Sequence, residues 1–434
     1  MGREVRLGRA AALPVLLAAL VAGAPTGGAA PVPQAHNRAT AAAISFTRTT
    51  FGVPSPTAIA RAPDGRVFIT SMLGNIHVLR INRSGGVVPG SHKVIRTLGE
   101  QLTLGIAVDP RSTKKRTIIW VSHSSPRVDT HDAPPDSSGV TRLTGRNFAR
   151  RRDVITGLPR STHDHAVNEI HFGPDRKLYI AQGGNTGAGA AFAGDKEFPG
   201  LRREQPLSAA ILVANVLARN FDGSCHNRDN IYGKPPCDVR PYATGLRNAY
   251  DFVFHSNGRM YAPDNGLGLQ GSYPPTPTPP CASPGDPARF NPGVQDDYLF
   301  RIVRGGYYGH PNPSRRQCVW GDGSDQGVAP LPNYHRPVLD LGSRRSADGI
   351  IEYHGRHFGI RGDLLVANWS NGDDITRVNI AGRAVRGSSP LPVPRIAGET
   401  KDFQNPLALA NGPGGAIYVA EHGADRVSVL LPTS

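Results

Sequence analysis

Two histidines that flank a carboxylate are the most chemically informative feature of the sequence. They lie in the segment Thr162-His163-Asp164-His165-Ala166-Val167-Asn168, directly before an apolar stretch that is typical of a β-strand. A neutral imidazole at such a position can act as a general base when a nearby carboxylate orients it. The same side chains can also bind a metal ion or cap the strand. All three interpretations stay open at this point.

A metal site would draw on one further residue of this region. Glu169 follows the segment, so His163, Asp164, His165 and Glu169 offer two imidazoles and two carboxylates. Such a donor set suits zinc or manganese, which can activate water for hydrolysis or promote elimination. A metal-assisted hydrolase or lyase is therefore one functional hypothesis.

The chain contains four cysteines, Cys225, Cys237, Cys281 and Cys318. In an exported chain this number indicates two disulfides, for which three connectivities are formally possible. We favour the local pairs Cys225 with Cys237 and Cys281 with Cys318, because each would close a long Gly- and Pro-rich loop. A zinc site is the competing interpretation, but no C-x-x-C spacing occurs.

The first thirty residues have the pattern of a secretory signal. Arg3, Arg6 and Arg9 form a basic region, and an apolar run over 10–22 leads into small residues. That run is too short to span a bilayer comfortably, and no cysteine precedes Cys225, so we expect neither a stable membrane anchor nor a lipid anchor. We predict a signal peptide over 1–30, a disordered lead-in over 31–43 and a secreted protein, either extracellular or associated with the periplasm or cell wall.

The formal net charge of the chain is +15, and arginine carries most of it. Nucleic-acid binding is one interpretation of such a balance. However, the densest cluster, Arg146 with Arg150, Arg151 and Arg152, is followed by Asp153 and contains no interleaved aromatic residues. We therefore expect no nucleic-acid partner, and attraction to anionic cell-wall or polysaccharide surfaces explains the charge equally well.

The elements that must position the candidate site form a repeat. The chain has 51 Gly and 39 Pro among 434 residues, yet aromatic and β-branched residues occur throughout, which excludes a disordered or collagen-like polymer. One unit recurs six times: an apolar strand, a turn of Gly, Pro, Asp or Asn, and a second strand. The copies occupy residues 57–69, 104–121, 169–180, 250–261, 349–367 and 407–419.

A two-stranded hairpin cannot bury a core alone, so the six copies must pack against one another. We therefore predict an all-β fold, a six-bladed β-propeller over residues 44–434, with insertions in the third to fifth blades. Ring closure would pair the strand at 44–47 with the last blade beside 427–430. A β-sandwich of two domains is the alternative fold.

Five segments spread over most of the chain follow one another in the order of a known family. They are Gly99-Glu100 to Pro110, Asp164-His165 with Phe172-Gly173-Pro174-Asp175, Gly245-Leu246-Arg247-Asn248, Ile302 to Asn312, and Gly412 to Val419. On these segments the sequence resembles the soluble PQQ-dependent glucose dehydrogenases and the wider glucose/sorbosone dehydrogenase family. The resemblance implies a six-bladed propeller whose channel mouth binds PQQ and calcium and oxidises a sugar hydroxyl, typically at the anomeric carbon.

The resemblance also implies roles for individual residues. His165 matches the general base, with Asp164 beside it in the catalytic segment. Arg247 matches an arginine that lies against the quinone oxygens, where its fixed charge would stabilise developing negative charge. The remaining cofactor-binding candidates are Asn248, Glu100 and Tyr250, the last of which stands where the family has a glutamine.

The resemblance further implies two calcium sites. The backbone carbonyls of Gly266 and Leu267 fall where the family ligates the calcium bound to PQQ. Asp297 and Tyr308 match a second, structural calcium site. Carbonyl and carboxylate oxygens are suitable ligands for a hard cation such as Ca²⁺.

Several positions depart from the family pattern. Gly184 stands in place of the acidic partner expected after the second strand of this blade, and a lysine that meets a cofactor carboxylate falls near Ser370. Paired arginines before the final blade have no counterpart in 401–406. Because PQQ carries three carboxylates, positive charge would have to come from elsewhere, with Lys401, Arg344 and Arg345 as candidates.

These observations favour a secreted quinoprotein that oxidises an aldose, with PQQ as hydride acceptor and calcium as Lewis acid. The expected partner is a small sugar or an extracellular glycan, and the electron acceptor stays open. One alternative is a propeller that has lost PQQ and binds extracellular carbohydrate without redox chemistry, an interpretation motivated by the missing cations. Its candidate aromatic contacts are Trp369, Tyr250, Tyr307 and Tyr308. The other alternative is the metal-assisted hydrolase or lyase described above.

Overall fold

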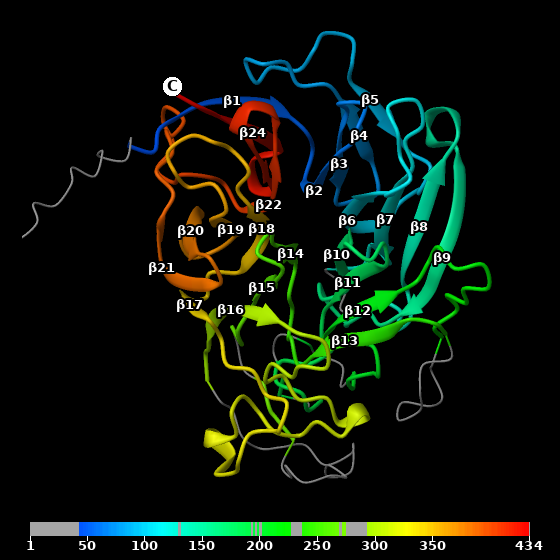
Figure 1. Ribbon diagram of the computed structural model, residues 1–434. Helices are drawn as coiled ribbons and strands as arrows, with labels where there is room; N and C mark the ends of the chain where they lie inside the picture. Colours follow the sequence, from blue (N-terminus) through cyan, green and yellow to red (C-terminus); the bar gives the residue numbers. More distant parts are fainter. Residues whose placement is uncertain are drawn as a thin grey trace, which may run out of the picture. The chain divides into compact units, whose positions relative to one another are not determined.

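The computed structural model describes residues 43–128, 132–191, 194–195, 198, 202–226, 237–268, 271–274 and 293–433. Over these residues the chain forms six antiparallel sheets of four strands each, arranged around a channel as a six-bladed β-propeller (Figure 1). The all-β propeller predicted from the repeat is therefore confirmed. The described residues contain no helix that is long and apolar enough to cross a membrane.

Each blade is a meander in which sequential strands are neighbours. Blades 1 and 2 contain β2 (Pro56–Arg61), β3 (Val67–Ser71), β4 (Ile76–Leu79), β5 (Lys93–Ile95), β6 (Leu102–Val108), β7 (Ile119–Ser124), β8 (Ser138–Thr144) and β9 (Arg150–Leu158). Blades 3 and 4 contain β10 (Val167–Phe172), β11 (Leu178–Gln182), β12 (Ala210–Ala214), β13 (Arg240–Thr244), β14 (Val253–Phe254), β15 (Met260–Asp264), β16 (Asp296–Ile302) and β17 (Leu339–Ser343). Blades 5 and 6 contain β18 (Ala347–Glu352), β19 (Leu364–Asn368), β20 (Asp374–Ala381), β21 (Ala384–Pro390), β22 (Pro406–Asn411), β23 (Ile417–Glu421), β24 (Arg426–Pro432) and β1 (Phe46–Gly52).

Helical structure in the described residues is limited to single turns of 3-10 helix. They are η1 (Arg146–Phe148), η2 (Pro313–Arg315), η3 (Ser324–Gln326), η4 (Pro413–Gly415) and η5 (His422–Ala424).

The N-terminal strand closes the ring. β1 pairs with β24 of the last blade, with Phe46 opposite Pro432 and Thr49 opposite Val429. The predicted closure by an N-terminal strand is confirmed, although the strand covers Phe46–Gly52 and not residues 44–47. Arg48 of β1 forms an ion pair of 2.5 Å with the fully buried Glu421 of β23. The two ends of the propeller are thus joined by both a strand ladder and a buried charge pair.

The first strand of every blade lines the channel, where β2 packs against β6 and β22, and β6 packs against β10. Close approach of these strands requires small residues. A Cβ added to Gly105 of β6 would lie only 2.5 Å from the carbonyl oxygen of Asn168 on β10, which is closer than atoms can pack. Gly349 of β18 meets the carbonyl oxygen of Leu407 on β22 at 2.7 Å in the same way.

Because every blade is an antiparallel meander, its ends fall on two faces of the ring. On the first, which we call the leading face, the first strands begin and the second strands connect to the third. On the second, which we call the turn face, the first strands turn into the second and the third into the fourth. The candidate site lies on the leading face, because its residues directly precede first strands.

The hydrophobic core is divided into layers between neighbouring blades rather than concentrated at the centre. One buried cluster joins Trp120 and Ile155 of blade 2 to Ile170 and Leu178 of blade 3, and five comparable clusters join the other neighbouring pairs. This arrangement explains the repeat, since each hairpin buries its two faces only when blades stand on both sides.

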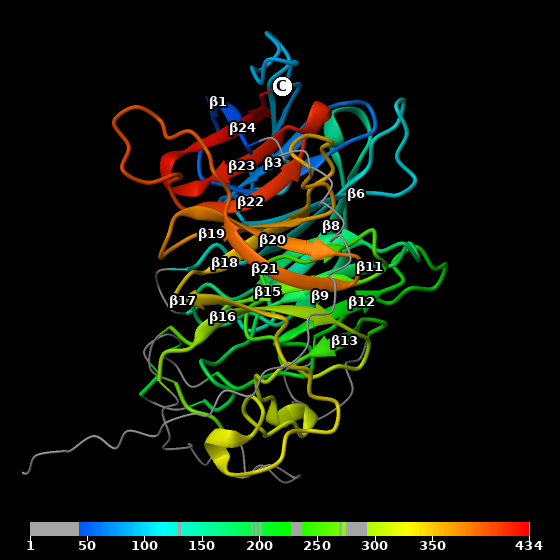
Figure 2. The ribbon, with the colours of Figure 1, turned by 60° about the vertical axis from the view of Figure 1, so that its left-hand side comes forward.

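All six copies of the sequence repeat are the first two strands of a blade. The long insertions fall in blades 3 and 4, and the predicted insertion in the fifth blade is wrong, because β18 to β21 span only Ala347 to Pro390. Figure 2 shows the yellow connection between β16 and β17 extending beyond the ring of blades.

The predicted disulfide between Cys225 and Cys237 is confirmed, with Cα atoms 5.0 Å apart. Cys318 is also disulfide-bonded, but its predicted partner Cys281 lies outside the described residues. The predicted signal peptide over 1–30 and nearly all of the lead-in over 31–43 lie outside them as well. Those two assignments stay predictions.

Candidate active site

A cavity of about 840 Å³ lies at the mouth of the channel on the leading face. Met72, Leu102, Leu104 and Leu407 give it one apolar wall, from blades 1, 2 and 6. The opposite wall is polar and comes from blades 3 to 5. Its residues include Asp164, His165, Asn168, Arg247, Asn248, Asn265, Asp297, Arg344 and Asp348. Most of the predicted catalytic and cofactor-binding residues therefore gather in one place.

His165 is held as a neutral base at the edge of this cavity. Its side chain is buried, and its Nδ1 atom lies 3.0 Å from the carbonyl oxygen of Gly184. Because a carbonyl only accepts hydrogen bonds, Nδ1 must carry the hydrogen and Nε2 must carry the free lone pair. Burial, followed by the positive charge of Arg247, lowers the pKa of His165 from 6.5 to about 3. The imidazole is therefore uncharged at neutral pH and able to accept a proton at Nε2.

Asp164 also lines the cavity but does not orient His165. Its carboxylate pairs with the Nδ1 atom of His163 at 3.0 Å, and 59% of its side chain is exposed. The orienting group for His165 is instead a backbone carbonyl. A main-chain contact of this kind has no signature in the sequence.

Arg247 places a fixed positive charge in the same cavity. Its backbone N–H and that of Asn248 donate to the carboxylate of Asp264, at 2.9 and 2.8 Å, and its Nε donates to the carbonyl oxygen of Gly187 at 3.1 Å. The side chain is buried, so its charge is only weakly screened by water. Burial raises the pKa of Asp264 to about 7 against the effect of these donors.

Three asparagines form a chain of hydrogen bonds across the polar wall. Asn168 donates to the Oδ1 atom of Asn248 at 2.9 Å, and Asn248 donates to the Oδ1 atom of Asn265 at 3.0 Å. Asn265 in turn donates to the carbonyl oxygen of Ala347 at 3.1 Å. The chain runs from blade 3 to blade 5 and fixes the amide of Asn248 at the cavity wall.

The predicted calcium ligands divide between two neighbouring cavities. Gly266 and Asp297 line the channel mouth, whereas Tyr308 lines a separate cavity of about 400 Å³, and Leu267 is fully buried. Both oxygens of Asp297 accept backbone hydrogen bonds, from Gly266 at 2.9 Å and Ala347 at 2.8 Å. The structure does not bring Asp297 and Tyr308 into one shared cavity.

A second carboxylate accompanies Asp297 at the channel mouth. Asp348 is buried in the cavity wall, and burial together with the charge of Asp297 raises its pKa well above the usual value. Burial likewise raises the pKa of Asp297. Two acidic groups that oppose each other's ionisation offer hard oxygen donors and favour a nearby cation.

Two of the predicted cofactor contacts have other surroundings. Glu100 is exposed and does not line the cavity. Tyr250 does line it, but its hydroxyl contacts the carbonyl oxygens of Thr57 at 2.9 Å and Leu104 at 3.0 Å. Tyr250 therefore joins three blades at the floor of the cavity.

Of the three cations proposed to replace the missing family cations, Arg344 lines the cavity. Arg345 instead pairs with Asp374 at 2.7 Å, and Lys401 pairs with Asp373 at 2.6 Å. Arg344 donates to the carbonyl oxygen of Gly268 at 2.7 Å. No acidic side chain among the described residues forms an ion pair with it. Arg247 and Arg344 are thus the two arginines of the site.

The residues of the hydrolase or lyase hypothesis do not gather around one point. The Oε2 atom of Glu169 accepts hydrogen bonds from the backbone of Ile106 and Ile170, each at 3.0 Å, and so links β6 to β10. Within the described ranges, no three His, Cys, Asp or Glu side chains lie close enough together to hold a metal ion.

Sequence reasoning missed Asp264, Asn265 and Asp348 as parts of the site. Asp264 ends β15, the second strand of blade 4, and Asn265 follows it, whereas Asp348 lies at the start of β18, the first strand of blade 5. Their place at the leading ends of strands was the available signal. Glu204 accepts a hydrogen bond from His310 at 3.0 Å, and both side chains lie close to Gly184. No pattern in the sequence pointed to Glu204.

Comparison with known proteins gives consistent results. The sequence profile of the glucose/sorbosone dehydrogenase family matches residues 53–428. No curated protein matches the chain.

Solved structures of similar fold include a putative oxidoreductase (glucose dehydrogenase) of Thermus thermophilus, at 21% identity and TM-score 0.56 over 89% of this chain and 100% of that chain. The PQQ-bound aldose sugar dehydrogenase of Streptomyces coelicolor is similar at 18% identity and TM-score 0.55, over 90% and 99% of the two chains. The PQQ domain of a pyranose dehydrogenase of Coprinopsis cinerea is similar at 13% identity and TM-score 0.57, over 89% and 97%. At these low identities, the TM-scores show a shared fold.

Proposed function

Because this chain belongs to the glucose/sorbosone dehydrogenase family, we propose that the cavity at its channel mouth oxidises a sugar hydroxyl with bound PQQ and calcium. The observation that carries the proposal is the pairing of a neutral buried base with a buried cation. His165 presents its Nε2 lone pair beside the fixed charge of Arg247. This combination can remove a hydroxyl proton and stabilise the negative charge that develops.

The residues of the cavity fit such a cofactor pair in charge and donor type. When bound, PQQ would supply a two-electron acceptor and calcium would supply a Lewis-acidic charge beside it. Arg344 can meet a carboxylate of the cofactor, and Arg247 can lie against its quinone oxygens. Asp297, Asp348 and the carbonyl of Gly266 are hard oxygen donors suited to calcium. The apolar wall offers a surface for a flat ring system.

Two arginines are fewer than the three carboxylates of PQQ, so we expect the divalent cation to provide much of the remaining attraction. PQQ and calcium should therefore bind cooperatively. In the site, His165 would take the hydroxyl proton at Nε2, while the Gly184 carbonyl keeps the ring in its orientation. Arg247 would stabilise negative charge where it develops.

The decisive experiment is reconstitution followed by absorption spectroscopy. The purified protein is titrated with PQQ in calcium, in magnesium and in a chelator, and a shifted PQQ spectrum is expected with calcium. The reconstituted protein is then offered a panel of aldoses with an artificial electron acceptor. No spectral change under any condition would remove the quinoprotein proposal.

A second function, carbohydrate binding without redox chemistry, is favoured by one observation. Trp369 lies with its ring centroid 4.9 Å from that of His422, and both line the cavity, where they can stack on a sugar. Sugar titration of the protein without PQQ separates the two functions. Saturable sugar binding together with no PQQ spectrum would favour this second one.

We further propose that the protein is secreted, with residues 1–30 as signal and 31–43 as a lead-in. The basic and then apolar start of the chain supports this, as does the disulfide between Cys225 and Cys237, which persists in an oxidising compartment. Mass spectrometry of the N-terminus of protein collected outside the cytoplasm tests it. Intact residues 1–30 there would contradict the proposed cleavage.

A further inference from the structure

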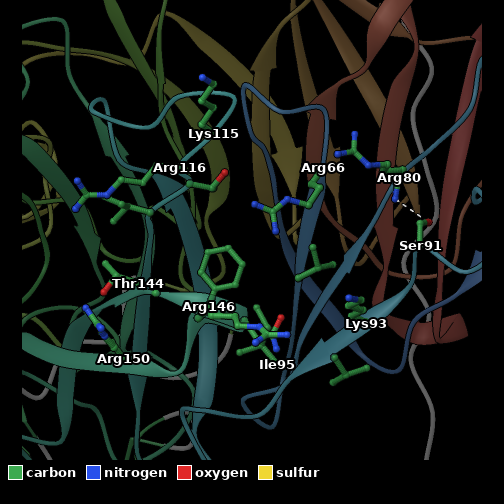
Figure 3. A pocket seen from close by; sticks show the side chains of 17 residues that line it. Arg66, Arg80, Ser91, Lys93, Ile95, Lys115, Arg116, Thr144, Arg146 and Arg150 are labelled. Atoms are coloured by element: carbon green, nitrogen blue, oxygen red, sulfur yellow. Dashed lines mark hydrogen bonds between the residues drawn. The ribbon is translucent and has the colours of Figure 1, made fainter.

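A second large cavity, of about 880 Å³, lies on the turn face between blades 1 and 2. Seven basic side chains line it and no Asp or Glu does. Figure 3 shows Arg66, Arg80 and Lys93 reaching it from blade 1. Lys115, Arg116, Arg146 and Arg150, also labelled in Figure 3, line it from blade 2. The basic character of the cavity is therefore assembled from several separate loops.

Most of these charges lack an acidic partner. Arg66 pairs with Asp64 at 2.6 Å. Among the described residues, no ion pair involves the other six, although Arg80 donates to the backbone carbonyl of Asp64 at 2.7 Å. Some arginines elsewhere on the chain are paired, as Arg345 is with Asp374 and Arg426 with Glu399, whereas these six cations face one cavity without such partners. A concentration of uncompensated cations in a concave site raises the local concentration of anions.

The loop that carries two of these arginines is held in a strained conformation. Asn147 and Phe148 both have positive φ, at 53° and 58°, which asparagine tolerates but which is costly for a bulky residue such as phenylalanine. Phe148 is buried and packs edge-to-face on Phe68, with ring centroids 5.3 Å apart. The buried ring anchors the turn in the layer between the blades, so that Arg146 and Arg150 are presented at a defined position.

The chemistry of the cavity restricts its ligand. Lysine and arginine together suit phosphate groups, and six unpaired cations exceed what a single phosphate can neutralise. Phe148 is the aromatic residue of the lining and is only 4% exposed, so no ring is free to stack on a nucleobase. A concave cleft without an exposed large apolar side chain also does not suit a flat lipid surface.

We propose that this cavity binds a phosphate-bearing carbohydrate or polyol polymer, with successive phosphates contacting Lys93, Lys115 and the arginines of both blades. The proposal is independent of the redox function, because the cavity lies on the turn face and the candidate active site on the leading face. Binding there would hold the protein on an anionic matrix while the channel mouth stays open.

The test uses the full-length protein and poly(glycerol phosphate) of defined length, labelled at one end and followed by fluorescence anisotropy. Lys115→Glu combined with Arg116→Glu is expected to weaken binding at least about 25-fold, and to reduce the slope of log affinity against log salt by about 2. The matched control is Arg356→Glu with Arg386→Glu, two exposed arginines without ion pairs among the described residues. It makes the same change in net charge and should alter affinity little.

Besides strong competition by a small anion, three results would overturn the proposal. They are absence of binding by the wild type, equal losses in the two double variants, and binding of single-stranded DNA of equal charge as tight as that of the polymer. Inorganic phosphate at equal phosphate concentration should compete weakly, and strong competition would instead identify a site for a small anion. Thermal unfolding of both double variants checks that the exposed substitutions leave the fold intact.

Discussion

The Nδ1 atom of His165 lies 3.0 Å from the carbonyl oxygen of Gly184. The family resemblance predicted an acidic side chain at position 184, but a Cβ there would lie 3.1 Å from the Oε1 atom of Glu204 and 3.2 Å from the Nε2 atom of His310. The main-chain carbonyl therefore takes over the task of selecting the tautomer. A neutral carbonyl stabilises an imidazolium less than a carboxylate does, which agrees with the low pKa of His165.

Removal of the His165 side chain should affect turnover more than cofactor binding. We expect His165→Ala to lower kcat by about 10²- to 10⁴-fold, since no other group in the cavity offers a neutral imidazole at that position. The dissociation constant for PQQ, measured by spectral titration, should change little. Asp164→Asn is the companion variant and should have a much smaller effect, because that carboxylate pairs with His163. If Asp164→Asn reduced kcat as much as His165→Ala, the carboxylate and not the carbonyl would support the base.

The ionisation of His165 makes a prediction that requires no substrate. Its pKa of about 3 lies below the usual 6.5, so its neutral form should persist from about pH 8 down to about pH 5. Nitrogen NMR of the purified protein, with His165→Gln to assign the resonance, measures this directly. A midpoint for His165 near 6.5 would contradict the assignment.

The fold could largely be predicted from the sequence, because the residues that specify each hairpin lie within that hairpin. Each hairpin carries its own turn residues and alternation, and six similar hairpins leave few ways to bury their faces. His165, Arg247 and Asn248, which the sequence singled out, line the cavity, and each lies in a short motif a few residues before a first strand. The insertions were harder, since a long Gly- and Pro-rich stretch does not reveal which strands it connects.

The remaining parts of the site depend on contacts that have no sequence pattern. The orienting carbonyl of Gly184 is main chain, and Asp348 reaches the cavity from a different blade than His165. Arg344 and Arg345 are adjacent in the sequence, but only their ion pairing and position show which of them faces the cavity. These contacts form only when the blades assemble into the ring, so they cannot be predicted from the sequence of any single blade.

Arg344 and its neighbour Arg345 provide a matched test of cofactor binding. Arg344→Gln should weaken PQQ binding by about tenfold or more, because it removes one of the two arginines that line the cavity. Arg345→Gln and Lys401→Gln should leave PQQ binding almost unchanged, since their charges are committed to Asp374 and Asp373. Spectral titration in calcium measures all three. Equal losses in the three variants would show that overall charge, and not a contact of Arg344, governs binding.

Closure of the propeller should depend on one buried carboxylate. Glu421 is fully buried and pairs with Arg48 of β1 at 2.5 Å and with Arg426 of β24 at 2.6 Å. Glu421→Gln leaves these two guanidinium groups without that negative charge, so we expect the free energy of unfolding to fall by about 3–5 kcal/mol. Glu399→Gln, which removes the other partner of Arg426 at a position with 19% side-chain exposure, should cost less than about 1 kcal/mol. Urea unfolding followed by tryptophan fluorescence compares the two variants. Similar losses would mean that the junction between β1 and β24 is held by its strand ladder rather than by the buried charge.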